Sequence, residues 1–557
     1  MPNRSSSLSV TSRSSLRTSR ILRWAGLSAA MPALWACTSR TLEAPVVAPV
    51  QSFTTKVVQK INNEIDILFM IDDSSSMTVM QQKILLQLPL FMQVLQALPM
   101  GLPSVHVAVV SSDMGAPSDQ GDSIGCSQTG GDNGMFYFAP EGTCTATTLD
   151  TGATFIMDDA AGTTKNFSAA DPMGIGTVFQ CIALLGEAGC GFEHQLASID
   201  RALGADGQGP APATNMGFLR PEAYLGIVML TNEDDCSAPA SNVPLPVYSL
   251  NDGMQSISNS DGPIANYRCN GGPLGAHLCN DPTGPNPTAF EQPPLIPPPD
   301  AQGTAAAPTL NLTNCEDNET GSSALTEVSK FVADIKALKG DPGNQILVGG
   351  IIAPPTPYTV EWEPGTAGGM TSSELWPQVE HSCGPSGQFT NPMGQIVSDG
   401  SFGDPGVREA QFINAFGANG VVASICDPSY ASSMATIAMK LGELIKPKCI
   451  AGVIQQDANG QPTCTVTNEV MNGGVTTDVV VPSCAAQPGA APCWTLSPPD
   501  MTNNCPAGTQ GLTVSTDPNN PNPDSLDSLV ECATCVAGVS AAGCPCLGNG
   551  MDVAGCL

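Results

Sequence analysis

Residues 64–77 read EIDILFMIDDSSSM and divide into two halves of different character. The first half, from Ile65 to Ile71, is almost wholly apolar except for Asp66, which is typical of a strand buried on both faces of a parallel sheet. The run ends in two aspartates and three serines, and a helical pattern follows. Open α/β sheets bind ligands at the carboxyl ends of their strands. The stretch therefore predicts an α/β fold with oxygen ligands at one sheet edge, namely Asp72, Ser74 and Ser76.

Apolar runs and helical patterns alternate along the chain after this stretch. Such alternation is typical of a parallel or mostly parallel sheet covered by helices on both faces. Strands are predicted at 105–110, 224–230, 346–352 and 421–425. Helices are predicted at 77–98, 192–203, 324–338, 407–416 and 429–445, and we expect Pro89 to kink or divide the first of them. Three segments rich in Gly, Pro or Cys interrupt the pattern and are expected to be irregular, disulfide-clipped insertions, at about 115–180, 237–323 and 354–400.

The Asp-x-Ser-x-Ser loop after an apolar strand resembles the metal-ion-dependent adhesion site of the von Willebrand factor type A (VWA) family. The run Tyr224–Leu230 ends in Thr231-Asn232, where that family has Thr-Asp-Gly. The resemblance implies a Rossmann-like VWA fold over residues 61–449. It also implies a Mg²⁺ or Ca²⁺ ion held by Asp72, Ser74, Ser76 and Asn232, with Glu193 or Asp234 as further ligands.

Two residues depart from the family pattern. Asn232 stands where the family has an aspartate, so one negative charge is missing and we expect weak binding of a divalent cation. Glu193 is the nearest oxygen-bearing replacement for a threonine that the family supplies from the loop before a helix. For the first loop, a polar N-cap of the following helix is the alternative interpretation.

The first 36 residues are typical of an export signal. They contain five arginines and no acid, and they end in a mostly apolar run that is too short to span a bilayer as a helix. Leu34-Trp35-Ala36-Cys37 resembles the lipobox of bacterial lipoproteins, which implies that Cys37 is lipidated and begins the mature chain. An ordinary signal peptide with a nearby cysteine is the alternative. Residues 37–60 then form a tether.

The chain has 21 cysteines, an odd number that needs an explanation in an exported protein. If Cys37 carries lipid, an even number remains, and disulfides are the expected state of cysteines outside the cytosol. Local pairs are predicted between Cys126 and Cys144 and between Cys269 and Cys279. Residues 450–557 are expected to be a disulfide-rich, irregular C-terminal region.

The charge and the motifs of the chain exclude some classes of function. The net charge of −31 excludes a basic footprint for nucleic acid. The Gly121–Gly125 segment reads Gly-x-Ser-x-Gly but lacks the strand and helix that a nucleophile elbow requires. We therefore expect a non-enzymatic, extracytoplasmic binding or adhesion module, a lipoprotein of the bacterial cell envelope, outer membrane or cell surface. It would engage a protein partner and meet the membrane only through its lipid anchor. The alternatives are a secreted hydrolase on an α/β scaffold and a structural envelope protein with a non-functional metal site.

Overall fold

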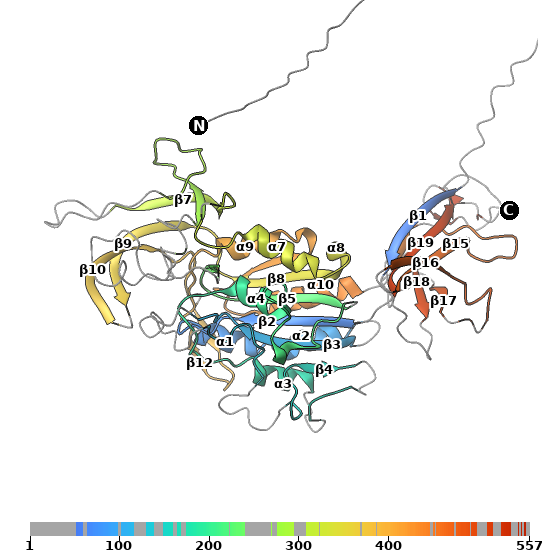
Figure 1. Ribbon diagram of the computed structural model, residues 1–557, viewed down its shortest axis with the longest axis horizontal. Coiled ribbons are helices and arrows are strands. Elements are labelled where there is room, and N and C mark those ends of the chain that lie inside the picture. Colours follow the sequence, from blue (N-terminus) through green and yellow to red (C-terminus); the bar gives the residue numbers. More distant parts are fainter. Residues whose placement is uncertain are drawn as a thin grey trace, which may run out of the picture. The chain divides into compact units, whose positions relative to one another are not determined.

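The computed structural model contains a six-stranded sheet between Glu64 and Ser424 (Figure 1), with the strand order β13-β8-β5-β2-β3-β4. Five of its strands run parallel, and β4 pairs antiparallel with β3 at the edge. The mostly parallel sheet predicted from the sequence is confirmed. Its strands are β2 (Glu64–Ile71), β3 (Ser104–Ser111), β4 (Ile156–Asp158), β5 (Tyr224–Leu230), β8 (Ile346–Ile352) and β13 (Gly420–Ser424).

β2 lies in the middle of this sheet because the chain builds outward from it in both directions. It pairs with β3 on one side and with β5 on the other, so the strand order reverses between β2 and β5. A reversal of this kind opens a crevice at the carboxyl ends of the strands, which is where α/β folds bind ligands. All residues of β5 and β8 are buried, as their apolar sequences predict.

Helices cover both faces of the sheet, and each face has its own hydrophobic core. One core packs α1, α2, α3 and α10 on the sheet, and the other packs α4, α7 and α9. Gly226 of β5 lets α10 approach closely, because a Cβ there would lie 2.7 Å from Cδ2 of Leu441. The helices are α1 (Thr78–Leu85), α2 (Leu88–Gln96), α3 (Ile175–Ile182), α4 (Gln195–Leu203), α7 (Val328–Ala337), α8 (Pro342–Gln345), α9 (Val407–Asn414) and α10 (Ala431–Ile445), with short 3₁₀ turns at Ala213–Asn215 and Gly417–Asn419.

Pro89 divides the helical segment after β2, as predicted. It lies in the first turn of α2, where its missing N–H breaks no helical hydrogen bond. The segment at 115–180 is more regular than predicted, since β4 extends the central sheet and α3 packs in the core.

The two later insertions also contain regular structure, which the Pro- and Gly-rich composition did not predict. They combine into a four-stranded sheet with the order β10-β9-β7-β6, and a short hairpin, β11-β12, follows. Antiparallel pairing lets residues from both insertions satisfy each other's backbone groups. The strands are β6 (His277–Asn280), β7 (Leu310–Asp317), β9 (Tyr358–Ala367), β10 (Met370–Val379), β11 (Gln388–Thr390) and β12 (Ile396–Ser398).

The C-terminal region is rich in disulfides, as predicted, and has more strand than predicted. β1 (Ser52–Gln59), from the expected tether, pairs antiparallel with β19 in the sheet β1-β19-β15-β16. Disulfides join Cys464 to Cys532, Cys484 to Cys493 and Cys535 to Cys544. The other strands are β14 (Cys449–Ala451), β15 (Cys464–Asn472), β16 (Val475–Val481), β17 (Cys493–Ser497), β18 (Thr509–Ser515), β19 (Ser525–Cys535), β20 (Leu547–Gly548) and β21 (Met551–Asp552).

The structure describes part of the chain, and the signal segment, Cys37, Cys126 and Cys144 lie outside that part. None of the described helices is both long and apolar enough to cross a membrane. The described residues are 52–59, 64–98, 102–115, 130–138, 149–159, 164–168, 174–221, 223–239, 269, 276–293, 308–321, 323–367, 370–385, 387–445, 449–451, 453–472, 475–488, 490, 492–497, 509–515, 525–535, 544, 547–548 and 551–552.

Candidate metal site

The loop after β2 folds back on its own first side chain. Asp72 is fully buried, and its Oδ1 accepts a hydrogen bond of 2.9 Å from the backbone N–H of Ser74. The hydroxyls of Ser74 and Ser76 lie 3.1 Å apart. Gln81 of α1 holds the loop in place by donating from Nε2 to the carbonyl of Asp72. The three predicted ligands therefore face one another at the carboxyl end of the central strand.

The loop after β5 meets this first loop. Thr231 donates from Oγ1 to Oδ2 of Asp72 over 2.7 Å, and Ser76 donates from Oγ to Oδ1 of Asn232 over 3.0 Å. Asn232 is buried and its Nδ2 has no hydrogen-bond partner. The parallel pairing of β2 with β5 brings both loops to the same sheet edge. Asn232 thus lies next to the first loop, within hydrogen-bond distance of Ser76.

Glu193 approaches the same point from the loop before α4. Its Oε2 accepts a hydrogen bond of 2.6 Å from Ser112 Oγ, which lies 3.4 Å from Asp72 Oδ1. Its Oε1 is buried and has no hydrogen-bond partner. Asp72, Ser74, Ser76, Asn232 and Glu193, five of the six predicted ligands, are therefore gathered in one place.

Asp234, the sixth predicted ligand, belongs to a different network. Its Oδ2 lies 2.9 Å from Nε2 of His277, and its Oδ1 accepts from the backbone N–H of Arg408. Among the described residues, no hydrogen bond joins it to the Asp72 loop. The structure thus groups Asp234 with the network around Arg408.

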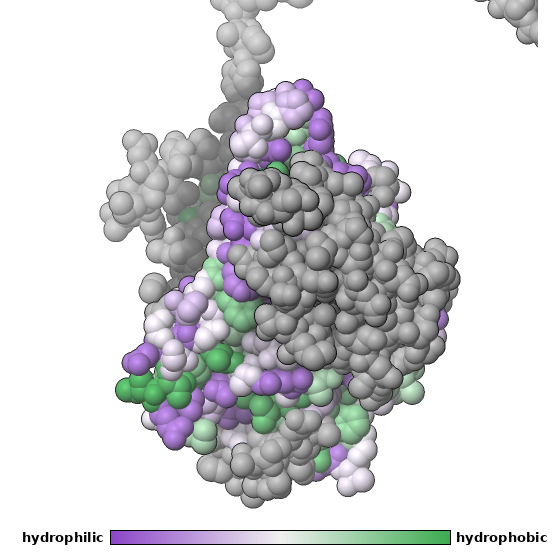
Figure 2. Space-filling model, turned by 90° about the vertical axis from the view of Figure 1, so that its left-hand side faces the viewer, coloured by the Kyte–Doolittle hydropathy of each residue, from purple (hydrophilic) through white to green (hydrophobic). Residues whose placement is uncertain are grey.

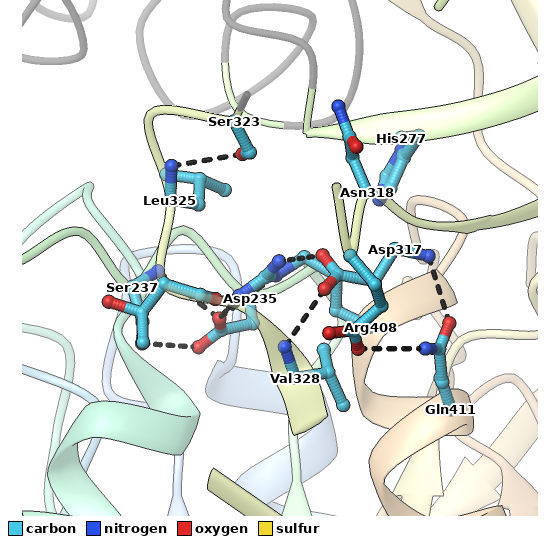
Figure 3. A network of polar contacts seen from close by, with 12 residues as sticks. Asp235, Ser237, His277, Asp317, Asn318, Ser323, Leu325, Val328, Arg408 and Gln411 are labelled. Atoms are coloured by element: carbon cyan, nitrogen blue, oxygen red, sulfur yellow. Dashed lines mark hydrogen bonds and ion pairs between the residues drawn. The ribbon is translucent and has the colours of Figure 1, made fainter. Parts of the chain in front are cut away.

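Arg408 of α9 is the centre of that second network, which Figure 3 shows. Its fully buried guanidinium lies 3.0 Å from Oδ2 of Asp235 and also pairs with Asp317. Asp235 accepts from the backbone N–H of Leu196 in α4, and Asp317 accepts from that of Val328 in α7. One cation therefore neutralises two aspartates that cap two helices of the same sheet face.

The Asp72 cluster has a different charge balance. Burial raises the pKa values of four acids, Asp72, Asp73, Glu193 and Glu233, and is the largest cause for each of them. Neighbouring acids raise the pKa values of Asp73, Glu193 and Glu233 further. The pKa of Asp73 rises to about 8, through burial and then through Asp72. Glu193 has a pKa well above its usual range, through burial, Asp72 and then Glu233.

Two other buried acids of the described residues face a base. Asp399 lies 2.9 Å from Lys83, and Asp66 lies 2.8 Å from Arg220. The cluster at Asp72 forms no ion pair with a base in the described part of the chain, and it contains three buried polar atoms without a hydrogen bond: Asp73 Oδ1, Glu193 Oε1 and Asn232 Nδ2. Buried carboxyl groups are stabilised either by a proton or by a countercharge. A divalent cation would supply it.

The donor set suits a hard cation. No group of three or more His, Cys, Asp and Glu side chains that could hold a metal ion by themselves occurs among the described residues. The Asp72 cluster instead combines carboxylates with hydroxyl and amide oxygens, which are ligands that Mg²⁺ and Ca²⁺ accept. The residues present therefore fit such an ion.

Four residues of this cluster were not predicted from the sequence as site residues: Asp73, Ser112, Thr231 and Glu233. Ser112 directly follows β3, and Thr231 directly follows β5, so both stand at the carboxyl ends of strands that neighbour β2. Ser112 and Thr231 could have been predicted from their positions directly after a strand. Ser111, next to Ser112, bonds to Asp132 instead, and the sequence does not distinguish the two serines.

Disulfides hold the segments next to the site. Cys236, four residues after Asn232, pairs with Cys269, and Cys279 pairs with Cys315. The predicted Cys269–Cys279 bridge is therefore wrong, because β6 pairs with β7 and brings Cys279 to Cys315. Cys383 and Cys426 are also bonded. The predicted Cys126–Cys144 pair lies outside the described residues.

No protein-family model matches this chain, and no curated protein matches it significantly. Solved structures that resemble it include a von Willebrand factor type A protein from Catenulispora acidiphila, at 10% identity and a TM-score of 0.25, covering 87% of this chain and 66% of that one. The pilus adhesin SpaC from Lactobacillus rhamnosus GG has 10% identity and a TM-score of 0.24, covering 87% of this chain and 42% of SpaC. The pilus adhesin RrgA from Streptococcus pneumoniae has 9% identity and a TM-score of 0.24, covering 87% of this chain and 58% of RrgA. This chain spans 66% or less of the length of each, and likenesses this low carry no argument about the site.

Proposed function

We propose that this chain is a non-enzymatic, extracytoplasmic VWA-type binding module that engages a protein partner through a divalent cation. The observation that carries the proposal is the buried acid cluster around Asp72, which no basic side chain of the described residues neutralises. Mg²⁺ or Ca²⁺ held by Asp72, Ser74, Ser76, Asn232 and Glu193 would provide the missing charge. When bound, such an ion offers a positive centre to an acidic group of a partner.

The surface also offers other contacts to a partner. Figure 2 shows the face that lies to the left in Figure 1, where hydrophobic and hydrophilic residues are mixed over the coloured part. Exposed apolar side chains of the described residues include Met393 and Ile396 of the β11-β12 hairpin and its turn, at 78% and 72% exposure. A mixed surface of this kind is ordinary for a non-obligate protein interface.

An extracytoplasmic location is supported by the disulfides of the described residues, since such bonds persist in oxidising compartments. We further propose that Cys37 carries the lipid anchor. Mass spectrometry of the native protein should then find a diacylglyceryl group on Cys37 and no peptide upstream of it. An unmodified N-terminus beyond Cys37 contradicts the anchor and leaves the binding module untouched.

Calorimetric titration with Mg²⁺ and Ca²⁺ tests the cation site. We expect one bound ion per chain in the wild type and none in Asp72→Asn, which keeps the size of the side chain and removes its charge. Asp399→Asn is the matched control, because Asp399 is also buried but is neutralised by Lys83. Binding that persists in Asp72→Asn, or that is absent from the wild type, contradicts the proposal.

A further inference from the structure

We propose that Glu193 is an internal carboxylate ligand of the cation, and that a carboxylate from a partner must displace it. The inference rests on the proposed function and adds that Glu193 competes with the partner's carboxylate for the cation. Its basis is the placement of Glu193, whose side chain faces Asp72 across the hydroxyl of Ser112.

The backbone of Glu193 is fixed between the loops of the site. It forms a β-bridge with Asp113, just beyond β3, and its carbonyl accepts a hydrogen bond of 2.7 Å from the N–H of Cys236. The next residue, His194, donates from its N–H to the carbonyl of Ser112. These bonds fix the backbone from which the Glu193 side chain extends toward Ser112.

Glu193 is only 1% exposed, so water cannot solvate a charge on its side chain. Ser112 satisfies Oε2, while Oε1 has no hydrogen-bond partner although it is buried. Asp72 and Glu233 are both acidic neighbours that repel the charged form. A buried acid placed in this way among other acids is suited to bind a cation.

The charge of Glu193 also compensates for the second loop. Asn232 contributes a neutral amide where the VWA family has a carboxylate, and Glu193, ionised by the cation, would supply the charge that this loop lacks. Ligand number and charge set the affinity of a hard cation. With Glu193 bound, the ion needs no acid from outside, and an incoming acid competes with a ligand held at high local concentration.

Glu193→Gln and Glu193→Thr test this inference with Mn²⁺ as the probe ion. Glutamine keeps the shape and removes the charge, and threonine restores the residue type of the family. We expect Mn²⁺ to bind about tenfold more weakly to both variants. Water-proton relaxation should show more exchangeable water on Mn²⁺ bound to Glu193→Thr, and acetate should bind to that complex more tightly than to the wild type. Asp200→Asn is the control, because Asp200 of α4 is equally buried and has no hydrogen bond to the site.

The outcomes separate the two proposals. Wild-type affinity and wild-type water relaxation in both Glu193 variants overturn the internal ligand and leave the cation site standing. An equal loss of affinity in Asp200→Asn also overturns it, because the effect is then structural. A wild type that binds no Mn²⁺, Mg²⁺ or Ca²⁺ overturns the proposed function and the internal ligand together.

Discussion

Ser76 and Asn232 are 156 positions apart in the sequence, and their side chains are joined by a hydrogen bond of 3.0 Å. The bond connects the loop after β2 with the loop after β5. It shows that the hydroxyls of the first loop and the amide of the second face the same point. A charge placed at position 232 would therefore act directly on a cation bound there.

Asn232→Asp should tighten Mg²⁺ binding about tenfold, if the added carboxylate contributes roughly 1.4 kcal/mol. The amide and the carboxylate have nearly the same shape, so the hydrogen bond from Ser76 can remain. Calorimetric titration of both proteins measures the difference. Unchanged affinity would mean that position 232 does not contact the ion.

The same substitution should destabilise the metal-free protein, because it adds a buried negative charge to a cluster of acids that are themselves unpaired with a base in the described part of the chain. Thermal unfolding in the presence of a chelator checks this expectation. Excess Mg²⁺ should reverse the loss, since a ligand that binds only the folded state stabilises it.

Arg408→Met should lower the free energy of unfolding by about 3–5 kcal/mol. The substitution leaves Asp235 and Asp317 buried without their cation, and both cap helices of the central domain. Urea unfolding followed by circular dichroism provides the measurement. Lys330→Met is the comparison, because Lys330 forms a surface pair with Asp334 and its loss should cost no more than about 1 kcal/mol.

Asp200→Asn should stabilise the protein at pH 8 and leave its stability unchanged near pH 4. Burial, followed by Asp334, raises the pKa of Asp200 from 3.8 to about 8. Between these values the unfolded chain loses the proton and the folded chain retains it, so the stability contributed by this group falls as the pH rises. The limiting slope is about 1.4 kcal/mol per pH unit. Unfolding curves at several pH values should diverge across this window, and parallel curves would contradict the assignment.

Peptide mapping without reduction should recover Cys236 linked to Cys269, Cys279 to Cys315 and Cys383 to Cys426. Each bridge closes a loop of more than 30 residues. In the chain-entropy model such a loop contributes about 3–4 kcal/mol to stability. A peptide linking Cys269 to Cys279 would contradict the pairing in this structure.

The central sheet could be predicted because its strands are encoded locally. β5 and β8 begin and end at the predicted residues, since seven successive buried positions leave an unmistakable apolar run. β4 could not be predicted, because it has only three residues and gains its stability from pairing with β3. The sheet of the insertions depends likewise on partners that are distant in the sequence.

The residues of the candidate site that directly follow a strand could be predicted from the sequence more easily than the others. Asp72, Ser74 and Ser76 are contiguous with β2, whereas Glu193 reaches the site through a bridge to Asp113 that no local pattern encodes. Asp234 illustrates the converse, because it stands two residues from Asn232 and yet turns toward His277. Proximity in sequence did not decide which acid joins the cluster.

The pairing of β1 with β19 has a consequence for the order in which the protein matures. Ser52 pairs with Cys535 and Gln59 with Ser528, so a strand made at the start of the chain finds its neighbour only near the end. The central sheet and the helices that pack on it end at Ile445, and domains can fold while later residues are still being supplied. β1 therefore has no partner strand until β19 has been made, and unpaired strand edges are sites of unwanted association in β-sheet proteins. β1 thus precedes the central sheet in the sequence but is paired only after β19 has been made, and a chain truncated before β19 would retain the central sheet while leaving β1 without its partner.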